Sequence, residues 1–549
     1  MVTFVVFGSV VAFLLAFRFY GRFLDQRLSV DRDRPTPACF MRDGVDYSPA
    51  RAPVLLGHHF SSIAGAGPIV GPVIAATLFG WLPALLWIVL GSIFLGGAHD
   101  YSALVASVRH KARSIAEVAR QHLSRRSQLL LLAFIWLALV YVLVVFIDLT
   151  ATTFTLDGGV ASSSLFYILL ALLFGLFVYR LKVPLLVGSV IFVSLIFVGV
   201  WGGQQAPLRA ELLPTFGGYG VRHTWNLILI LYCYVASVTP VWALLQPRDY
   251  LSSFLLYATA AGALVGIMLG RFSAELPAYV SPELLGAEAV PLFPILFVTV
   301  ACGACSGFHS VIASGTTAKQ LAKETDARTV GYGSMLIEGF VAVLALATVM
   351  VVPFSASLSS KPPLTLYAEG MGRFLSVLGL SETAGTTFAL LAVSAFILTT
   401  LDTCTRLGRY VLQELIGRDG KGVRFYTTLG TLVLPTVFVM ITLRGPGGDP
   451  VPAWKVIWPV FGATNQLLAG LALLVLAVWL RNQGRRAYFL LLPFAFMIVT
   501  AISALVLLIA RYRLSPVGVV AALLLVLAVS LLAEGVACLR RPLASPGTS

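Results

Sequence analysis

Charged residues are scarce in this chain. Only 11% of its 549 residues are Asp, Glu, Lys or Arg, while 58% are hydrophobic and the mean hydropathy is +0.91. Soluble domains carry roughly a quarter of charged residues. The composition therefore excludes a soluble globular enzyme and predicts a polytopic membrane protein.

Cysteine is also rare, and several catalytic motifs are missing. The six cysteines fall mostly within or beside apolar runs and indicate no disulfide framework. Cys302 and Cys305 have the spacing of a metal-binding pair, but no second pair accompanies them, so we predict neither a metal nor a cofactor. The sequence contains no Walker A motif, no HExxH motif and no nucleophile elbow. We expect no enzymatic activity, no ATP-driven transport and no intramembrane proteolysis.

About fifteen apolar runs are long enough to cross a bilayer. They lie near 2–17, 54–76, 82–104, 128–150, 162–180, 182–202, 222–244, 251–270, 290–313, 332–352, 383–402, 426–443, 453–480, 487–510 and 516–535. Between the third and fourth runs, the segment 110–123 sets apolar residues against basic ones. This segment predicts a short amphipathic helix at the membrane surface.

The net charge of +14 comes mainly from loops on one side of the predicted membrane. Of the 38 Lys and Arg residues, 29 follow odd-numbered spans and 9 follow even-numbered ones. The positive-inside rule then places the N-terminus outside and the C-terminus in the cytoplasm. Because these basic residues flank the spans, we predict the lipid bilayer as their partner and no nucleic acid.

The second span contains residues that interrupt a helix. Its segment 57–72 reads GHHFSSIAGAGPIVGP. Irregular backbone at membrane depth is tolerated only where protein encloses it or water reaches it. The seventh span runs in the opposite direction and carries Ser237, Thr239 and Pro240 in its middle. Broken helices in two inverted halves predict a substrate site at the midplane, and a proline kink repaired by neighbouring helices is the alternative.

These features predict an all-α polytopic membrane protein. About 15 transmembrane helices surround a five-plus-five inverted-repeat core with two broken helices. We expect an accessory first helix and cytoplasmic loop at 1–53, five-helix repeats at 54–202 and 222–405, and appended helices at 424–549.

The predicted substrate site lies at the two broken helices. Half-helix N-termini near 65–71 and 237–240 would offer unpaired N–H groups and positive dipole ends to a substrate carboxylate. The residues expected to line this site are His59, Ser61, Ser62, Gly65, Gly67, Thr239, Trp242 and Gln246.

Other polar side chains at membrane depth predict an ion-coupling or proton-coupling site, since ionisable groups there are costly. Hydroxyls that recur every four residues in the ninth span form one stripe, which suits a hard cation such as Na⁺. The residues expected to take part are His309, Ser310, Ser314, Thr317, Glu338 and Asp402. Two alternatives stay open: the hydroxyls join helices together, and Asp402 forms an i, i+4 ion pair with Arg406.

Two further pairs of polar residues stand out. His99 and Asp100 lie at the end of the third span. They either have a structural role at the helix end or form a functional pair. Asn465 and Gln466 are interpreted as hydrogen-bonding groups between helices.

Six motifs between residues 50 and 480 resemble the carbon starvation protein A family of bacterial inner-membrane transporters. They are GHHFSSIAGAGPIVGP, LGGAHDY, PVWALLQPRDYL, CSGFHSVIASGTTAKQ, TTLDTCTRLGRY and WPVFGATNQLLAGLAL. The resemblance implies a five-plus-five inverted repeat, peptide uptake during carbon starvation and, in a close branch, pyruvate uptake by proton symport. This chain is shorter than the long members of that family, so we expect it to lack their extra terminal helices.

The expected function is secondary active import of small peptides across the bacterial inner membrane, driven by H⁺ or Na⁺. Symport of pyruvate or another small carboxylate is the alternative within the same class. A membrane starvation sensor or channel is the alternative of another class, although the sequence shows no kinase, receiver or soluble ligand-binding domain.

Overall fold

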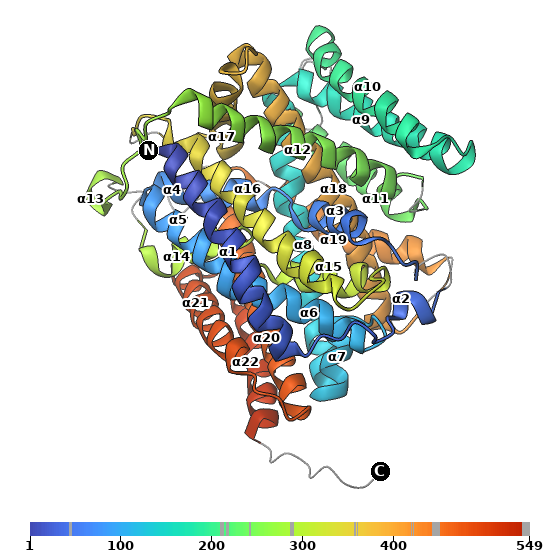
Figure 1. The fold of residues 1–549 in the computed structure, drawn as a ribbon. Helices are drawn as coiled ribbons and strands as arrows, with labels where there is room; N and C mark the ends of the chain where they lie inside the picture. Colours follow the sequence, from blue (N-terminus) through green and yellow to red (C-terminus); the bar gives the residue numbers. More distant parts are fainter. Residues whose placement is uncertain are drawn as a thin grey trace.

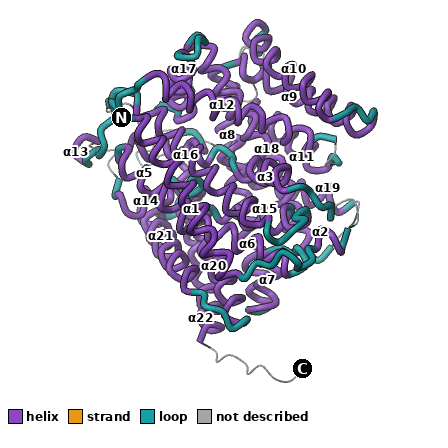
Figure 2. Tube along the Cα trace, viewed as in Figure 1, coloured by secondary structure: helices purple, strands orange, loops and turns teal. Residues whose placement is uncertain are grey.

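The computed structural model describes residues 1–540 except 43–46, 209–212, 216–218, 241–242, 286–289, 356–357, 359–360, 419, 421 and 442–450. Within these residues the chain is helical and has no β-strand, as Figure 2 shows, apart from one isolated bridge between Ala50 and Leu321. The elements are α1 (Val2–Leu28), α2 (Pro37–Phe40), α3 (Ala52–Ile63), α4 (Gly67–Phe79), α5 (Trp81–Leu90), η1 (Gly91–Gly96), α6 (Gly97–Arg109), α7 (Ile115–His122), α8 (Arg125–Leu156), α9 (Gly158–Gly175), η2 (Leu176–Arg180), α10 (Leu185–Gln205), α11 (Val221–Val238), α12 (Leu245–Gly270), α13 (Pro282–Leu285), α14 (Leu292–Thr299), α15 (Gly307–Gly315), η5 (Thr317–Lys319), η6 (Arg328–Tyr332), α16 (Gly333–Met350), α17 (Pro363–Ser376), α18 (Glu382–Ile416), α19 (Val423–Met440), α20 (Ala453–Asn482), α21 (Tyr488–Tyr512) and α22 (Pro516–Arg540).

The helices form a bundle whose length and hydropathy suit a membrane (Figure 1). Among the described residues, twelve helices are long and apolar enough to cross a bilayer, or thirteen when the pair α3 and α4, bent by 49°, counts as one span. The remaining predicted spans correspond to α11 and to the interrupted pair α14 and α15. The all-helical, multi-pass architecture expected from the sequence is confirmed.

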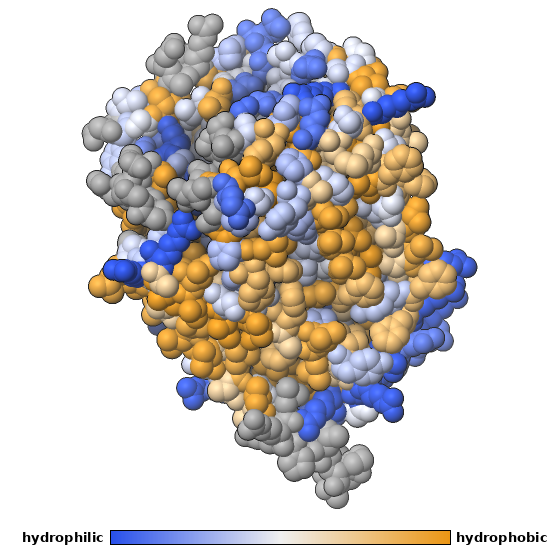
Figure 3. Space-filling view, turned by 90° about the vertical axis from the view of Figure 1, so that its left-hand side faces the viewer, coloured by the Kyte–Doolittle hydropathy of each residue, from blue (hydrophilic) through white to orange (hydrophobic). Residues whose placement is uncertain are grey.

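Apolar side chains cover the outside of the bundle. On the face in Figure 3 they gather in a broad band across the middle, with hydrophilic residues above and below it. Large side chains on the outer helices are almost fully exposed, among them Phe4, Leu186 and Leu492. Exposed apolar side chains on this scale are unfavourable in water, so the band is the surface that contacts lipid.

The same order of elements occurs twice. An interrupted helix (α3 and α4) is followed by a helix with a π-helical turn (α5 to α6), the short amphipathic α7 and the long α8. Later the interrupted pair α14 and α15 is followed by η6 with α16, the short α17 and the long α18. Helix α7 confirms the predicted amphipathic segment, and the Ser114 hydroxyl caps it by accepting a hydrogen bond from Glu117 N–H.

The second broken helix is not where we predicted it. Residues 239–244 separate the complete helices α11 and α12, so the seventh span is not interrupted in its middle. The interruption falls instead in the ninth predicted span, at residues 300–306 between α14 and α15. We call residues 64–66 the first interruption and residues 300–306 the second interruption.

Helices α9 and α10 form a hairpin that packs against α12 and α18. Figure 1 shows them side by side at one edge of the bundle. Their contacts belong partly to a separate apolar cluster that includes Tyr167, Phe174 and Phe192. This hairpin lies outside the twice-repeated order of elements.

Helix α20 crosses the interior of the bundle, and its most apolar stretch is completely buried. Close packing there requires small residues. A Cβ atom on Gly462 would collide with the carbonyl oxygen of Val298 in α14 and would lie 2.8 Å from its carbonyl carbon.

We predict that Gly462→Ala lowers the free energy of unfolding by about 1–3 kcal/mol, because backbone atoms of α14 would have to move. Gly8→Ala is the control, since a Cβ at Gly8 meets nothing within 4 Å. Thermal unfolding of the purified protein in detergent measures both variants. Equal melting temperatures for the two would contradict the prediction.

Candidate functional site

The start of α4, directly after the first interruption, touches the second interruption in the interior, and we call this the contact of the two interruptions. A Cβ on Gly67, in the first turn of α4, would lie 2.5 Å from the Cβ of Cys302 in the second interruption. A Cβ on Gly71 would lie 2.5 Å from the carbonyl oxygen of Thr299 at the end of α14. Glycine at both positions therefore lets the two irregular segments approach directly, as a midplane site built from broken helices requires.

Other helices enclose this contact. A Cβ on Gly65 would lie 2.7 Å from the Thr400 hydroxyl of α18 and 3.1 Å from the Phe146 ring of α8. The backbone N–H of Phe308, in the first turn of α15, donates to Asn465 Oδ1 on α20 over 3.1 Å. This bond satisfies one of the N–H groups left open at the start of a helix.

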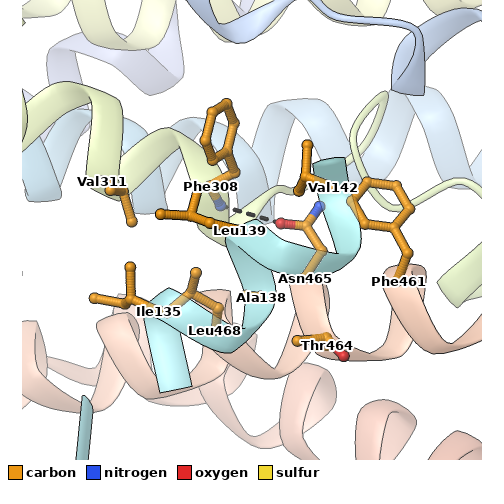
Figure 4. Close-up of a pocket in the computed structure, with 10 residues that line it drawn as sticks. All are labelled: Ile135, Ala138, Leu139, Val142, Phe308, Val311, Phe461, Thr464, Asn465 and Leu468. Atoms are coloured by element: carbon orange, nitrogen blue, oxygen red, sulfur yellow. Dashed lines mark hydrogen bonds between the residues drawn. The ribbon is translucent and has the colours of Figure 1, made fainter. Parts of the chain in front are cut away.

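Asn465 also lines a narrow crevice between α8, α15 and α20, shown in Figure 4. Its walls are Ile135, Ala138, Leu139, Val142, Phe308, Val311, Phe461, Thr464, Asn465 and Leu468. The crevice has a volume of about 10 Å³, which is room for about one water molecule. The bundle is therefore closed around the crevice.

The predicted substrate residues of the second span lie together on α3 and at its end. His59 is fully buried, and its Nδ1 lies 2.8 Å from the Thr317 hydroxyl. Ser61 and Ser62 each donate to the carbonyl of His58, over 3.1 and 2.8 Å. Gly65 lies within the first interruption, and Gly67 directly follows it.

The predicted substrate residues of the seventh span are not all described. Thr239 lies at the end of α11, where its hydroxyl donates to Val235 O. Trp242 lies outside the described residues, and so does the side chain of Gln246.

Behind the second interruption lies a group of four buried ionisable side chains. We call His99, Asp100, His309 and Glu338 the Asp100 cluster; all four are fully buried. The two oxygens of Asp100 lie 2.7 Å from His99 Nδ1 and 2.7 Å from His309 Nδ1. Nε2 of His309 lies 3.0 Å from Glu338 Oε2, at ion-pair distance but without the geometry of a directed hydrogen bond.

The charges of the Asp100 cluster do not balance. His309 faces a carboxylate with each ring nitrogen, so both nitrogens must carry a proton for it to serve both partners. The cluster then holds one cation, His309, and two carboxylates. His99 is neutral, because a proton on Nδ1 alone is enough for it to donate to Asp100. An uncompensated negative charge at membrane depth is costly. The cluster can take up one more proton, and Glu338, whose oxygens accept no hydrogen bond in the described part of the chain, is the open acceptor.

The hydroxyls predicted as cation ligands are already engaged. Ser310 donates to Gly307 O and Ser314 donates to Ser310 O, each over 2.7 Å. Ser314 also accepts from Ile115 N–H over 3.2 Å. The Thr317 hydroxyl is bound to His59. These hydroxyls therefore form hydrogen bonds within α15 and between neighbouring segments.

A second buried group joins α11, α12 and α18. We call Tyr232, Arg248, Asp249 and Asp402 the Arg248 cluster. Arg248 is fully buried and binds Asp402, the Tyr232 hydroxyl at 2.6 Å and Leu398 O at 3.0 Å. The Tyr232 hydroxyl itself donates to Asp402 over 2.9 Å.

The alternative in which Asp402 forms an i, i+4 pair with Arg406 is wrong. Arg406 instead donates to Ala236 O at 2.8 Å and Thr239 O at 2.7 Å. Arg409 donates to Ser237 O at 2.9 Å. The two guanidinium groups of α18 thus satisfy carbonyls left open where α11 ends.

Residues 1–362 and 354–504 match the model of a protein family described as carbon starvation protein CstA. The chain belongs to this family. It is 33% identical over 568 residues to the peptide transporter CstA of Escherichia coli, covering 91% of this chain and 80% of that protein. It is 31% identical to the peptide transporter CstA of Bacillus subtilis (90% and 88% covered) and 31% identical to the pyruvate/proton symporter BtsT of E. coli (88% and 78% covered).

A solved structure shares the fold of this CstA family member. The crystal structure of MhsT in complex with L-phenylalanine aligns over 89% of this chain and 99% of that one, with a TM-score of 0.51 and 13% sequence identity. At this identity the likeness shows the fold alone. The expected five-plus-five fold class and the family resemblance are confirmed.

Sequence reasoning missed a buried carboxylate in this CstA family member. Asp148 of α8 is fully buried; its Oδ2 accepts from Trp454 N–H over 3.0 Å and its Oδ1 lies 3.6 Å from Arg222 Nε. Arg248 and Asp249 were missed as well. All three are ionisable residues within or beside apolar runs, so the rule that singled out Glu338 would have found them.

We predict that Asp402→Asn destabilises the protein strongly, by about 3–5 kcal/mol, because it removes the carboxylate that the buried Arg248 binds directly and leaves only Asp249, 3.4 Å away. A triple variant, Arg248→Met with Asp402→Leu and Asp249→Asn, should recover most of that loss, since it removes all three charges. Thermal unfolding of wild type, Asp402→Asn and the triple variant measures the recovery. A triple variant less stable than Asp402→Asn would contradict the pairing.

Proposed function

We propose that this chain is a secondary active transporter that imports small peptides across the bacterial inner membrane by proton symport, in the response to carbon starvation. The observation that carries the proposal is the direct contact of the two interruptions, backed by the unbalanced Asp100 cluster. A substrate site and a proton-binding site thus share α15, which begins at the second interruption and carries His309. Relatives named peptide transporter CstA supply the substrate class.

The proposed orientation places the N-terminus outside and the C-terminus in the cytoplasm, as the distribution of Lys and Arg favours. Helix α7 and the loops after α1 and α20 then face the cytoplasm. Transport driven inward by the proton gradient needs this orientation.

The proposed division of the chain differs from the one expected from sequence. The first repeat comprises α3 to α8 together with α11 and α12, and the hairpin α9–α10 is an insertion. The second repeat comprises α14 to α20. Helix α1 precedes the core, and α21 and α22 follow it. The support is the twice-repeated order of elements, with each long helix, α8 and α18, packed against the other.

The proposed substrate site lies at the contact of the interruptions, between α8 and α18. The residues before α4 and α15, Ala66 and Ser306, form no side-chain cap. The positive dipole ends of both half-helices and the open N–H groups of α4 suit an anion, whereas Phe308 N–H of α15 is already bound by Asn465. A peptide carboxylate is such an anion. His59, Ser61, Ser62, Gly65 and Gly67 form one wall of the site, and Thr239, Trp242 and Gln246 remain proposed members of it.

Proton coupling is assigned to His309 and Glu338 together with Asp100. When the cluster is neutralised by an extra proton, His309 holds α15 against α6 and α16. Loss of that proton leaves two carboxylates around one imidazolium, and the net negative charge is costly at membrane depth, so it favours a rearranged cluster that water can reach. The half-helix at the substrate site is then free to move, which links the gradient to the site.

A proton fits the site better than Na⁺. The hydroxyls of Ser310, Ser314 and Thr317 form hydrogen bonds but keep lone pairs, so they do not decide between the two ions. The unbalanced Asp100 cluster favours a proton, because one proton on Glu338 neutralises it. Asp402, also proposed for coupling, is paired with Arg248 and is better suited to hold α12 against α18. The relative named a pyruvate/proton symporter agrees with a proton.

Uptake into proteoliposomes tests the proposal. Purified protein is supplied with a radiolabelled dipeptide or with pyruvate, under a pH gradient or a Na⁺ gradient applied separately. Concentrative dipeptide uptake under the pH gradient alone is expected. Concentrative uptake of pyruvate alone would favour the alternative substrate, and the absence of accumulation under either gradient would favour a sensor or a channel.

We predict that Glu338→Gln abolishes concentrative uptake under a pH gradient but preserves exchange of labelled for unlabelled dipeptide. The amide keeps the size of the side chain and removes the group that takes up the proton. Glu369→Gln is the matched control, because Glu369 lies on α17, partly exposed and 3.8 Å from Lys361. Equal loss of both activities in Glu338→Gln, or equal behaviour of the two variants, would refute the coupling role.

We predict that Gly67→Ala lowers the initial rate of dipeptide exchange by about tenfold or more, since the new methyl group would force the interruptions apart. Adding Cys302→Gly to this variant should restore a large part of the rate, because it removes the atoms that collide with the methyl group. Ala at Gly57, where the nearest atom would lie 3.4 Å away, is the control. A double variant no faster than Gly67→Ala would argue against the contact as the reason.

A further inference from the structure

A basic cavity lies at the end of the bundle where α1, α6 and α20 finish. Its volume is about 390 Å³. It is lined by Arg34, Pro35, Phe40, Val108, Arg109, Lys111, Gln483 and Arg485. These residues come from the segment after α1, the end of α6 and the turn after α20, so the cavity joins three parts of the chain that are distant in sequence.

Positive charge exceeds negative charge around this cavity. Arg34 and Arg109 both pair with Glu324, at 3.0 and 2.7 Å. Lys111 and Arg485 form no ion pair among the described residues, and Arg485 donates instead to Leu28 O over 2.6 Å. Four cations therefore share one buried carboxylate.

The pKa values of Glu324 and Arg485 both reflect this excess of positive charge. Burial would raise the pKa of Glu324, but hydrogen bonds from Arg109 and from Asp31 N–H lower it overall, so the carboxylate is ionised. Burial lowers the pKa of Arg485, and the charges of Arg109 and Arg34 lower it further. Among the described residues, the guanidinium of Arg485 is thus held near like charges with Glu324 as the opposing carboxylate.

The lining residues and the volume of the cavity limit which anion can neutralise these cations. Glu324 fixes Arg34 and Arg109 beside each other, so two guanidinium groups are preorganised. Phe40 is 56% exposed at the cavity and Pro35 lies with it. The volume falls within the range of about 300–1,000 Å³ that is typical of small-molecule sites.

We propose that this cavity binds a phosphate-bearing anion, with Lys111 and Arg485 as its main cationic contacts and Phe40 packing against the rest of the ligand. Guanidinium groups bind phosphate through two parallel N–H bonds, and lysine binds it as a point charge. Two sources present this chemistry: the headgroup of an anionic lipid, which basic pockets at membrane surfaces bind, and a soluble nucleotide.

The site is separate from the proposed transport machinery. Arg109 lies nine residues after Asp100 on the same helix, α6, which is about 13 Å at 1.5 Å per residue. Binding at the cavity therefore does not require the Asp100 cluster or the interruptions.

The test compares a cavity variant with a variant that loses the same charge nearby. The cavity variant is Lys111→Gln with Arg485→Gln. The control is Arg113→Gln with Arg486→Gln, since neither residue lines the cavity. Full-length protein is titrated with AMP by calorimetry in detergent. In a second arm, native mass spectrometry counts the phosphatidylglycerol retained from nanodiscs that also contain phosphatidylcholine.

Wild type and control should bind alike, and the cavity variant should bind about tenfold or more weakly, because it loses two charge-assisted contacts. An effect in the AMP arm identifies a soluble ligand, and an effect in the phosphatidylglycerol arm identifies a lipid. If the double variant does not elute as a single species, the exposed Lys111→Gln alone is used. The proposal is overturned if neither probe distinguishes wild type from the cavity variant, or if the control loses as much. Glu338→Gln should retain full binding, which separates this site from failure of the transport proposal.

Discussion

The contact between the two interruptions is the constraint on which the rest of the structure depends. Backbone that leaves a helix inside a membrane must find partners within the protein, and here each irregular segment is enclosed by the other and by α8, α18 and α20. Gly67 and Gly71 make the approach possible because a side chain at either position would collide with backbone or Cβ atoms of the partner segment. In the proposed substrate site, the uncapped start of α4 would offer N–H groups and a positive dipole end to a carboxylate-bearing substrate.

The buried charges fall into groups with different physical roles. In the Arg248 cluster the guanidinium pairs with Asp402, lies 3.4 Å from Asp249, and also donates to a hydroxyl and a carbonyl, so the group ties α12 to α18. Asp148 is similarly held by a backbone N–H and by Arg222. The Asp100 cluster is different, because the cation that its two carboxylates share is a histidine. An imidazole takes up and releases a proton near neutral pH, whereas the guanidinium of Arg248 stays charged and keeps Asp402 as its partner. Coupling is therefore better assigned to the Asp100 cluster than to Asp402.

Local patterns in the sequence predicted the local features well. The apolar runs, the amphipathic α7 and the first interruption all follow from residues close together in the chain. The second interruption was misplaced because two spans carry similar signals: Ser237, Thr239 and Pro240 end α11 without breaking it, whereas the small residues from Cys302 to Ser306 looked like helix packing. The partner of Asp402 was missed for a related reason. Arg248 lies 154 residues away, and sequence reasoning sees only pairs such as Asp402 and Arg406 that one helix brings together.

Helix α6 connects these features. Gly96, just before it, packs against the carbonyl of Ala304 in the second interruption. Asp100 in its first turn holds His309 of α15, and Arg109 at its end holds Glu324 beside the basic cavity. A helix is stiff over this length, so a small displacement at either end moves the other. The protonation of the Asp100 cluster and the filling of the cavity therefore act on one rigid element, and α6 is where a ligand at the membrane surface would influence the half-helix at the substrate site.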